Sequence, residues 1–149
     1  MIPRFGQIQP GRAYRRRPGA YAILVRDGSA LLTFQQAPVP EYQLPGGGID
    51  PGEAAIPALH REVREETGWS ISRQRFLGQY RRFCFMPDYD LWAEKVCSIW
   101  LARPILCLGP PTEAGHRAEW VALDRVAEKL ADAGSRAMLG RFASQIRAG

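Results

Sequence analysis

Three glutamates placed close together are the residues of this chain best suited to do chemistry. Glu62, Glu65 and Glu66 stand at positions i, i+3 and i+4. On a helix this spacing puts all three carboxylates within one arc of about 100°. Like charges at i and i+4 destabilise a helix by about 0.2–0.5 kcal/mol per pair, so a positive partner is expected. That partner is either Arg61, in a surface ion pair, or a hard divalent cation that carboxylates hold and that bridges substrate phosphates.

A glycine triplet, Gly46–Gly48, precedes these glutamates and is expected to form a flexible loop. Without side chains, its main-chain groups can approach a metal ion or a phosphate closely. A glycine triplet alone is typical of any loop. Followed directly by a helix that carries carboxylates, it favours the metal-binding interpretation.

The segment 53–67 is expected to form the helix that carries the glutamates. Ala55, Leu59 and Val63 recur every four residues and give a narrow apolar stripe. Pro57 lies near the start, where a missing N–H costs least, and Gly68 is a suitable C-terminal cap.

Strands are expected on both sides of this helix, at Ala20–Arg26, Ala30–Gln35, Tyr42–Leu44, Phe76–Phe85, Leu91–Leu101 and Glu119–Leu123. Asp124 is expected to cap a helix over Arg125–Ala131. A final helix would place Met138, Phe142 and Ile146 on one side. Strands before and after one central helix predict an α+β domain in which helices cover a mixed sheet.

The stretch Gly47–Trp69 resembles the Nudix box, G-x5-E-x7-R-E-U-x-E-E-x-G-U, where U is apolar. It reads GGIDPGEAAIPALHREVREETGW, and every fixed position matches. The one departure is Trp69, where a smaller aliphatic residue is usual. The resemblance implies an α/β/α sandwich with the box as a loop–helix–loop.

The resemblance also implies an activity: Nudix hydrolases use divalent cations, Mg²⁺ or Mn²⁺, to cleave a nucleoside diphosphate linked to a further group X. By position, Glu62, Glu65, Glu66 and the Gly46 carbonyl would be metal ligands. Glu53 and Arg61 would form an ion pair that braces the loop against the helix. Gly47 is a candidate substrate contact.

The class of substrate is narrowed by the subfamily signatures that this sequence lacks. The secondary signatures of NADH, coenzyme A and ADP-ribose pyrophosphatases are absent, and Pro45-Gly46-Gly47 stands in place of the Pro-Gln-Gly-Gly of RNA 5′-pyrophosphohydrolases. What remains is the MutT-like group, which hydrolyses nucleoside triphosphates, including oxidised ones, to a nucleoside monophosphate and pyrophosphate.

Residues outside the box would complete the site. Glu113, in the loop Gly109–Gly115, is predicted as general base; Glu94 and a box carboxylate, Glu65 first, are the alternatives. Arg26, Arg81 and Arg82 are candidates for clamping phosphates, or are solvated strand residues. His60 and His116 are expected to be surface histidines.

The composition of the chain limits the class of protein to which it can belong. The chain has 149 residues, 46% hydrophobic and 23% charged, which fits one globular domain. Its longest apolar run, Ala20–Val25, is too short to span a membrane. No secretory signal is recognisable, and three cysteines without C-x-x-C spacing favour reduced thiols, so a cytoplasmic location is expected.

Residues 1–18 are expected to form an Arg-, Gly- and Pro-rich arm or edge strand, and residues 19–149 a single Nudix hydrolase domain. The net charge of +5 comes with 18 arginines among 20 basic residues, which suits a phosphate-bearing small molecule. The arginines of Arg12–Arg17 keep an RNA 5′-end hydrolase as one alternative, although nucleic acid is not the favoured partner. The arm could instead be a solvated edge strand or a homodimer contact. A non-catalytic nucleotide-binding domain is the other alternative for the function of the chain.

Overall fold

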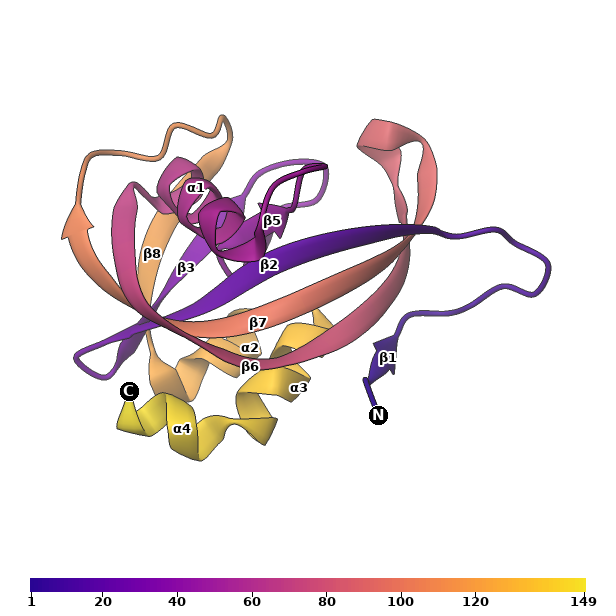
Figure 1. The fold of residues 1–149 in the computed structure, drawn as a ribbon. Coiled ribbons are helices and arrows are strands. Elements are labelled where there is room, and N and C mark those ends of the chain that lie inside the picture. The colour runs from indigo at the N-terminus through magenta and orange to yellow at the C-terminus, as the bar shows by residue number, and fades with distance from the viewer.

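A mixed eight-stranded sheet forms the centre of the computed structural model, which describes residues 1–149 (Figure 1). Its longest strands are β2 (Arg15–Arg26), β6 (Trp69–Met86) and β7 (Leu91–Cys107). Strand β2 pairs in parallel with β7, which pairs antiparallel with β6. The short β1 (Arg4–Phe5) extends the edge at β6.

The other side of β2 carries the shorter strands. It pairs antiparallel with β3 (Ser29–Gln35) and with β5 (Gly46–Gly48). Strand β3 in turn pairs with β4 (Glu41–Gln43) and β8 (His116–Ala122). The sheet therefore joins segments that lie far apart in the sequence.

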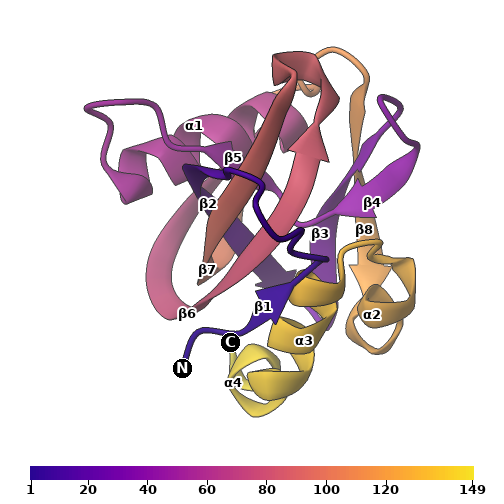
Figure 2. The same ribbon diagram turned by 90° about the vertical axis from the view of Figure 1, so that its right-hand side faces the viewer.

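Helices cover both faces of the sheet (Figures 1 and 2). Helix α1 (Ala55–Thr67) lies on one face. On the other lie α2 (Val126–Lys129), α3 (Ala133–Arg141) and α4 (Ala143–Ala148). Two short 3₁₀ turns, η1 (Pro87–Tyr89) and η2 (Leu123–Arg125), connect elements. The expected α/β/α sandwich is confirmed.

Strand β2 supplies both halves of the core, because successive side chains of a strand point to opposite faces. Ala22 and Leu24 pack with Leu59 and Val63 of α1. Ile23, between them, packs on the opposite side in the cluster that also contains Tyr80, Ile99, Met138 and Ile146. The near-continuous apolar run of β2 reflects burial on both faces.

Several expected boundaries are wrong. Strands β6 and β7 run well beyond their expected ends, and β2 begins at Arg15, five residues before the strand expected from Ala20 and within the segment 1–18 expected to be an arm or edge strand. The glycine triplet is a strand, β5: a Cβ at Gly46 would lie 2.2 Å from the Ala20 carbonyl oxygen, so only glycine fits against β2 there.

The C-terminal region also differs from expectation. Asp124 lies inside η2, where its side chain caps no helix. The expected final helix is interrupted at Phe142, whose backbone leaves the helical conformation between α3 and α4. Met138 and Ile146 are nevertheless both buried, because the two short helices still turn these residues toward the sheet. No helix of the protein is long and apolar enough to cross a membrane.

Candidate active site

Helix α1 is held firmly at both its face and its end. Leu59 and Val63 are completely buried against the sheet. Gly68 ends the helix with φ +79°, and its N–H donates to the Arg64 carbonyl. A Cβ at Gly68 would lie 1.9 Å from the Gly109 carbonyl oxygen, so glycine also permits the close approach of the loop that follows β7. The polar edge of α1 is thereby fixed in place.

Arg61 ties the loop before α1 to the helix. Its Nε and Nη2 donate to the two carboxylate oxygens of Glu53 at 2.9 Å each. Glu53 also accepts the N–H of Asp50 at 3.1 Å. These hydrogen bonds, that of Arg61 first, lower the pKa of Glu53 to about 2. A bidentate arginine–carboxylate pair fixes orientation as well as distance, so it braces the loop.

Glu62 lies directly beside the glycine strand. Its carboxylate is 3.0 Å from Nη1 of Arg61, and its side chain is 18% exposed. A Cβ at Gly47 would come within 2.5 Å of this carboxyl carbon. Burial raises the pKa of Glu62 although Arg61 opposes the shift. The absence of a side chain at Gly47 is therefore what allows Glu62 to occupy this position.

Glu66 is the most buried acid of the cluster, with 6% of its surface exposed. Its Oε1 accepts the N–H of Gly46 at 2.9 Å. Burial raises the pKa of Glu66 well above its ordinary value; the Gly46 hydrogen bond opposes this, and the charges of Glu62, Glu113 and Glu65 add to it. The four carboxylates thus lie near enough to repel one another.

The loop that carries Glu113 docks onto the last turn of α1. The backbone N–H groups of Thr112 and Glu113 both donate to the Glu65 carbonyl at 2.8 Å. These bonds satisfy a carbonyl that the helix end leaves without an intrahelical partner. The structure therefore places Glu113 with the box glutamates. Glu94 lies elsewhere, 3.3 Å from Arg81 and 3.7 Å from Arg16.

His116 is not the surface residue expected from the sequence. Its side chain is 12% exposed, with Nδ1 3.7 Å from Oε2 of Glu66. The hydroxyl of Thr33 lies 2.8 Å from the same nitrogen. Burial lowers the pKa of His116, while Glu113 opposes the shift. Since β8 places this histidine beside an acid fifty residues away in the sequence, no local pattern could have revealed it.

The three arginines expected to clamp phosphates lie in three different places. Arg26 lies over the Trp69 ring at 5.5 Å. Arg81 pairs with Glu94. Only Arg82, whose Nε is 3.7 Å from Asp132, lines the pocket that adjoins Gly46.

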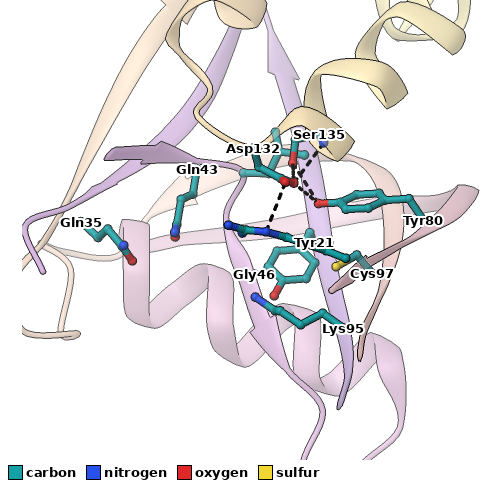
Figure 3. A pocket seen from close by; sticks show the side chains of 11 residues that line it. Tyr21, Gln35, Gln43, Gly46, Tyr80, Lys95, Cys97, Asp132 and Ser135 are labelled. Carbon is teal, nitrogen blue, oxygen red and sulfur yellow. Dashed lines mark hydrogen bonds and ion pairs between the residues drawn. The ribbon is translucent and has the colours of Figure 1, made fainter. Parts of the chain in front are cut away.

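That pocket, whose lining residues Figure 3 shows, lies on the face of the sheet opposite α1: Tyr80 and Cys97 belong to the core cluster that contains Met138 of α3, and Leu59 and Val63 of α1 belong to the other cluster. Tyr21, Lys95 and Asp132 line it together with Gly46, whose N–H bonds Glu66. Its polar residues come from five strands, β2, β3, β4, β6 and β7, and from the start of α3, so sequence patterns gave no signal that they would meet. The pocket is separated from the carboxylate cluster by a single peptide segment.

Asp132 is fully engaged within this pocket. It accepts hydrogen bonds from the Tyr80 hydroxyl, from the hydroxyl and N–H of Ser135 at 2.9 and 3.1 Å, and from the N–H of Gly134 at 3.4 Å. Burial alone would raise the pKa of Asp132, but the Tyr80 hydrogen bond and the charge of Arg82 bring it below its ordinary value. It therefore caps α3 as a carboxylate.

The donor set of the glutamate cluster suits a hard divalent cation. Carboxylate oxygens are the ligands that Mg²⁺ and Mn²⁺ prefer, and a cation would offset both the burial that raises the pKa values of Glu62 and Glu66 and the mutual repulsion that adds to it. In the present conformation no three acidic, histidine or cysteine side chains surround one point, since Glu62 turns to Arg61 and Glu66 to Gly46. Holding a cation requires these side chains to change partners.

Comparison with known proteins identifies the family. The model of the NUDIX domain matches residues 15–142, so the chain belongs to the Nudix family. Over 74 residues it is 36% identical to a Bacillus subtilis protein provisionally named 8-oxo-dGTP diphosphatase, with half of each chain covered. Over 98 residues it is 35% identical to an RNA pyrophosphohydrolase of Cereibacter sphaeroides, covering 62% of this chain and 56% of the relative.

A solved structure agrees in fold. The crystal structure of a MutT NUDIX hydrolase from Burkholderia pseudomallei superposes with a TM-score of 0.69 at 28% identity, covering 83% of this chain and 96% of the other. The matches to the two curated relatives span only about half of their length.

Proposed function

We propose that this protein is a metal-dependent hydrolase that cleaves a phosphoanhydride bond in a nucleoside diphosphate linked to a further group. Its most favoured substrate is a nucleoside triphosphate, which it converts to a nucleoside monophosphate and pyrophosphate. The observation that carries the proposal is the cluster of Glu62, Glu65, Glu66 and Glu113, set one peptide segment away from a polar pocket. This arrangement lets phosphates lie at the acids and the remainder of a nucleotide lie in the pocket.

Glu62, Glu65, Glu66 and the Gly46 carbonyl would hold Mg²⁺ or Mn²⁺. When bound, the cation would screen the phosphate charge and lower the pKa of a water molecule. Arg61 and Glu53 keep the loop and helix in fixed relation, so the backbone that carries the ligands stays in place while Glu62 and Glu66 exchange their present partners for the cation. Arg82 lines the pocket and would contact the substrate beyond the reacting phosphates.

Glu113 is the proposed general base. Its backbone is anchored to α1 while its side chain adds charge to the cluster, so its carboxylate can take a proton from the attacking water there. Glu94 serves as the matched comparison, because it is engaged by two arginines away from the cluster.

The pair Glu113→Gln and Glu94→Gln tests this role with Mg²⁺ saturating. Loss of a base should lower kcat of Glu113→Gln about 10²-fold or more with little change in substrate affinity, and Glu94→Gln should stay near wild type. If Glu113→Gln stays within twofold of wild type, the base lies elsewhere, and Glu65 is the next residue to test.

Hydrolysis at an RNA 5′ end is the second candidate, favoured by the name of the Cereibacter relative. A panel of nucleoside triphosphates, nucleoside diphosphate derivatives and 5′-triphosphorylated RNA, each with Mg²⁺ and with Mn²⁺, separates the candidates. Higher kcat/KM on the free nucleotides supports the proposal, and higher kcat/KM on RNA rejects it. Tight nucleotide binding without turnover of any compound would instead indicate a non-catalytic domain.

A further inference from the structure

Lys95 places a cation inside the pocket without an acidic partner. It lies on β7 and faces the same side of the sheet as the buried Cys97 and Ile99. Its ammonium is 5.7 Å from the centre of the Tyr21 ring. The interaction with Tyr21, whose side chain also hydrogen-bonds to Lys95, raises the pKa of Lys95 and outweighs burial, which lowers it. No salt bridge joins the Lys95 ammonium to a carboxylate. An ammonium has three N–H donors, so Lys95 keeps donors for a ligand beyond its contact with Tyr21.

Asp132, the acidic residue that lines the same pocket, does not neutralise the charge of Lys95. Its oxygens already accept from Tyr80, Ser135 and Gly134, and its charge is shared with Arg82. A buried polar group without a partner is costly, so a donor left free in a pocket suits an acceptor on a ligand.

Two glutamines on the other side of the pocket provide hydrogen-bond acceptors. Nε2 of Gln43 donates to Glu41 at 2.8 Å, and Nε2 of Gln35 donates to the Val39 carbonyl at 3.2 Å and to Glu41 at 3.4 Å. Because a carboxylate and a carbonyl only accept, these contacts fix which end of each amide is the nitrogen. The two amide oxygens remain free acceptors at the pocket lining, across from Lys95 (Figure 3).

The pocket also continues outward. Gln35, Arg82 and Lys95 line a second hollow as well, between the β6–β7 turn and residues 38–41, where the aromatic ring of Tyr89 is largely exposed. Lys95 and Gln35 thus lie where the two hollows adjoin, whereas Gln43 and Gly46 line the first hollow only.

We propose that Lys95, with the amide oxygens of Gln35 and Gln43, selects nucleotides whose base carries a keto group next to a ring N–H: guanine, hypoxanthine, uracil and thymine. Lys95 would donate to the keto oxygen, and a glutamine oxygen would accept the ring N–H. Adenine and cytosine present the reverse pattern, an amino group beside an unprotonated ring nitrogen. In the same orientation they would set a donor against Lys95 and an acceptor against the glutamine oxygen. This inference rests on the proposed function, because it assumes that the phosphates lie at the glutamates.

Equilibrium binding of the non-hydrolysable α,β-methylene analogues of GTP and ATP tests the inference by titration calorimetry without any turnover. A hydrogen bond from a charged donor corresponds to about tenfold to hundredfold in affinity, so wild type should prefer the GTP analogue by at least tenfold. Lys95→Met should reduce this preference below about threefold, mainly by weakening the GTP analogue. Lys95→Arg, which keeps a charged donor, should retain most of it.

The chain has a single other lysine, and Lys129→Met is the matched control, because Lys129 lies over the Tyr42 ring outside the pocket and should leave the preference unchanged. Equal affinity of wild type for the two analogues would overturn the inference. So would a Lys95→Met variant that stays folded and weakens both analogues equally, which would indicate a phosphate contact.

Turnover separates this inference from the proposed function. Hydrolysis of ITP and ATP at equal kcat/KM would reject base selection while leaving the hydrolase proposal intact. Selective binding of the GTP analogue without hydrolysis of any nucleotide would support base selection and reject the hydrolase proposal.

Discussion

Replacing Gly47 by alanine should lower activity about 10–100-fold while leaving the fold nearly as stable. The added Cβ would lie 2.5 Å from the carboxyl carbon of Glu62 and 2.7 and 2.8 Å from its oxygens. Ordinary carbon contacts lie near 3.5 Å, so the carboxylate must retreat by about 1 Å. Displacing a group that supports a metal site typically costs about 10–100-fold in metal affinity or activity. We expect a loss of that size for Gly47→Ala.

The effect on stability should be small because two terms offset each other. Gly47 is not among the glycines with positive φ, so alanine there gains about 0.4–1 kcal/mol from the unfolded state. Disturbing the partly exposed pair of Glu62 with Arg61 costs about 0–1 kcal/mol. A net change within about 1 kcal/mol corresponds to a Tm shift of only about 2–4 °C.

The assay combines thermal unfolding with kcat measured across a Mg²⁺ titration, and the neighbouring glycines are its controls. A Cβ at Gly48 meets nothing within 4 Å, so Gly48→Ala should behave like wild type. At Gly46, with φ +145°, a Cβ would meet the Ala20 carbonyl oxygen at 2.2 Å, so Gly46→Ala should destabilise the whole protein. Wild-type activity in Gly47→Ala, or a Tm loss as large as that of Gly46→Ala, would refute the reasoning.

Three further outcomes are expected. Glu65→Gln and Glu66→Gln should each lower kcat by about 10²-fold or more. In the absence of metal, the raised pKa of Glu66 makes its ionised form costly in the folded protein. Glu66→Gln should therefore unfold at a higher temperature than wild type at neutral pH, but not below pH 4.5. Since the pKa of Glu53 is lowered to about 2, its carboxylate stabilises the fold above pH 4.5 and loses this effect as pH falls toward 2. Glu53→Gln should therefore show a shallower fall of Tm over that range, and an unchanged slope would contradict the Arg61 pairing. Gly68→Ala should lower Tm by more than about 5 °C, measured calorimetrically, because its positive φ and the neighbouring loop both exclude a side chain.

The helix α1 and its glutamates could be predicted because the residues that determine them lie within one short segment of the sequence. The spacing of Glu62, Glu65 and Glu66 fixes one helix face, and Gly68 marks its end. The pairing of Arg61 with Glu53 was implied by the box and is present as a bidentate contact.

The rest of the site depends on contacts between distant segments. His116 is buried beside Glu66 because β8 pairs with β3, and Lys95 meets Tyr21 because β7 pairs with β2. The strand ends were underestimated because polar residues such as Arg15 and Arg16 still pair along β7. The glycine triplet reads as a loop, yet it pairs with β2, since strand pairing is decided by the partner as much as by the residues themselves.

The most direct test of the account is to identify the products formed from a nucleoside triphosphate by the wild-type protein and by Glu65→Gln, with Mg²⁺ and with chelator. The account predicts nucleoside monophosphate and pyrophosphate from wild type with Mg²⁺, and at most about a hundredth of that rate from Glu65→Gln or in chelator. Nucleoside diphosphate and phosphate as products, or hydrolysis that persists in the chelator or in Glu65→Gln, would contradict it.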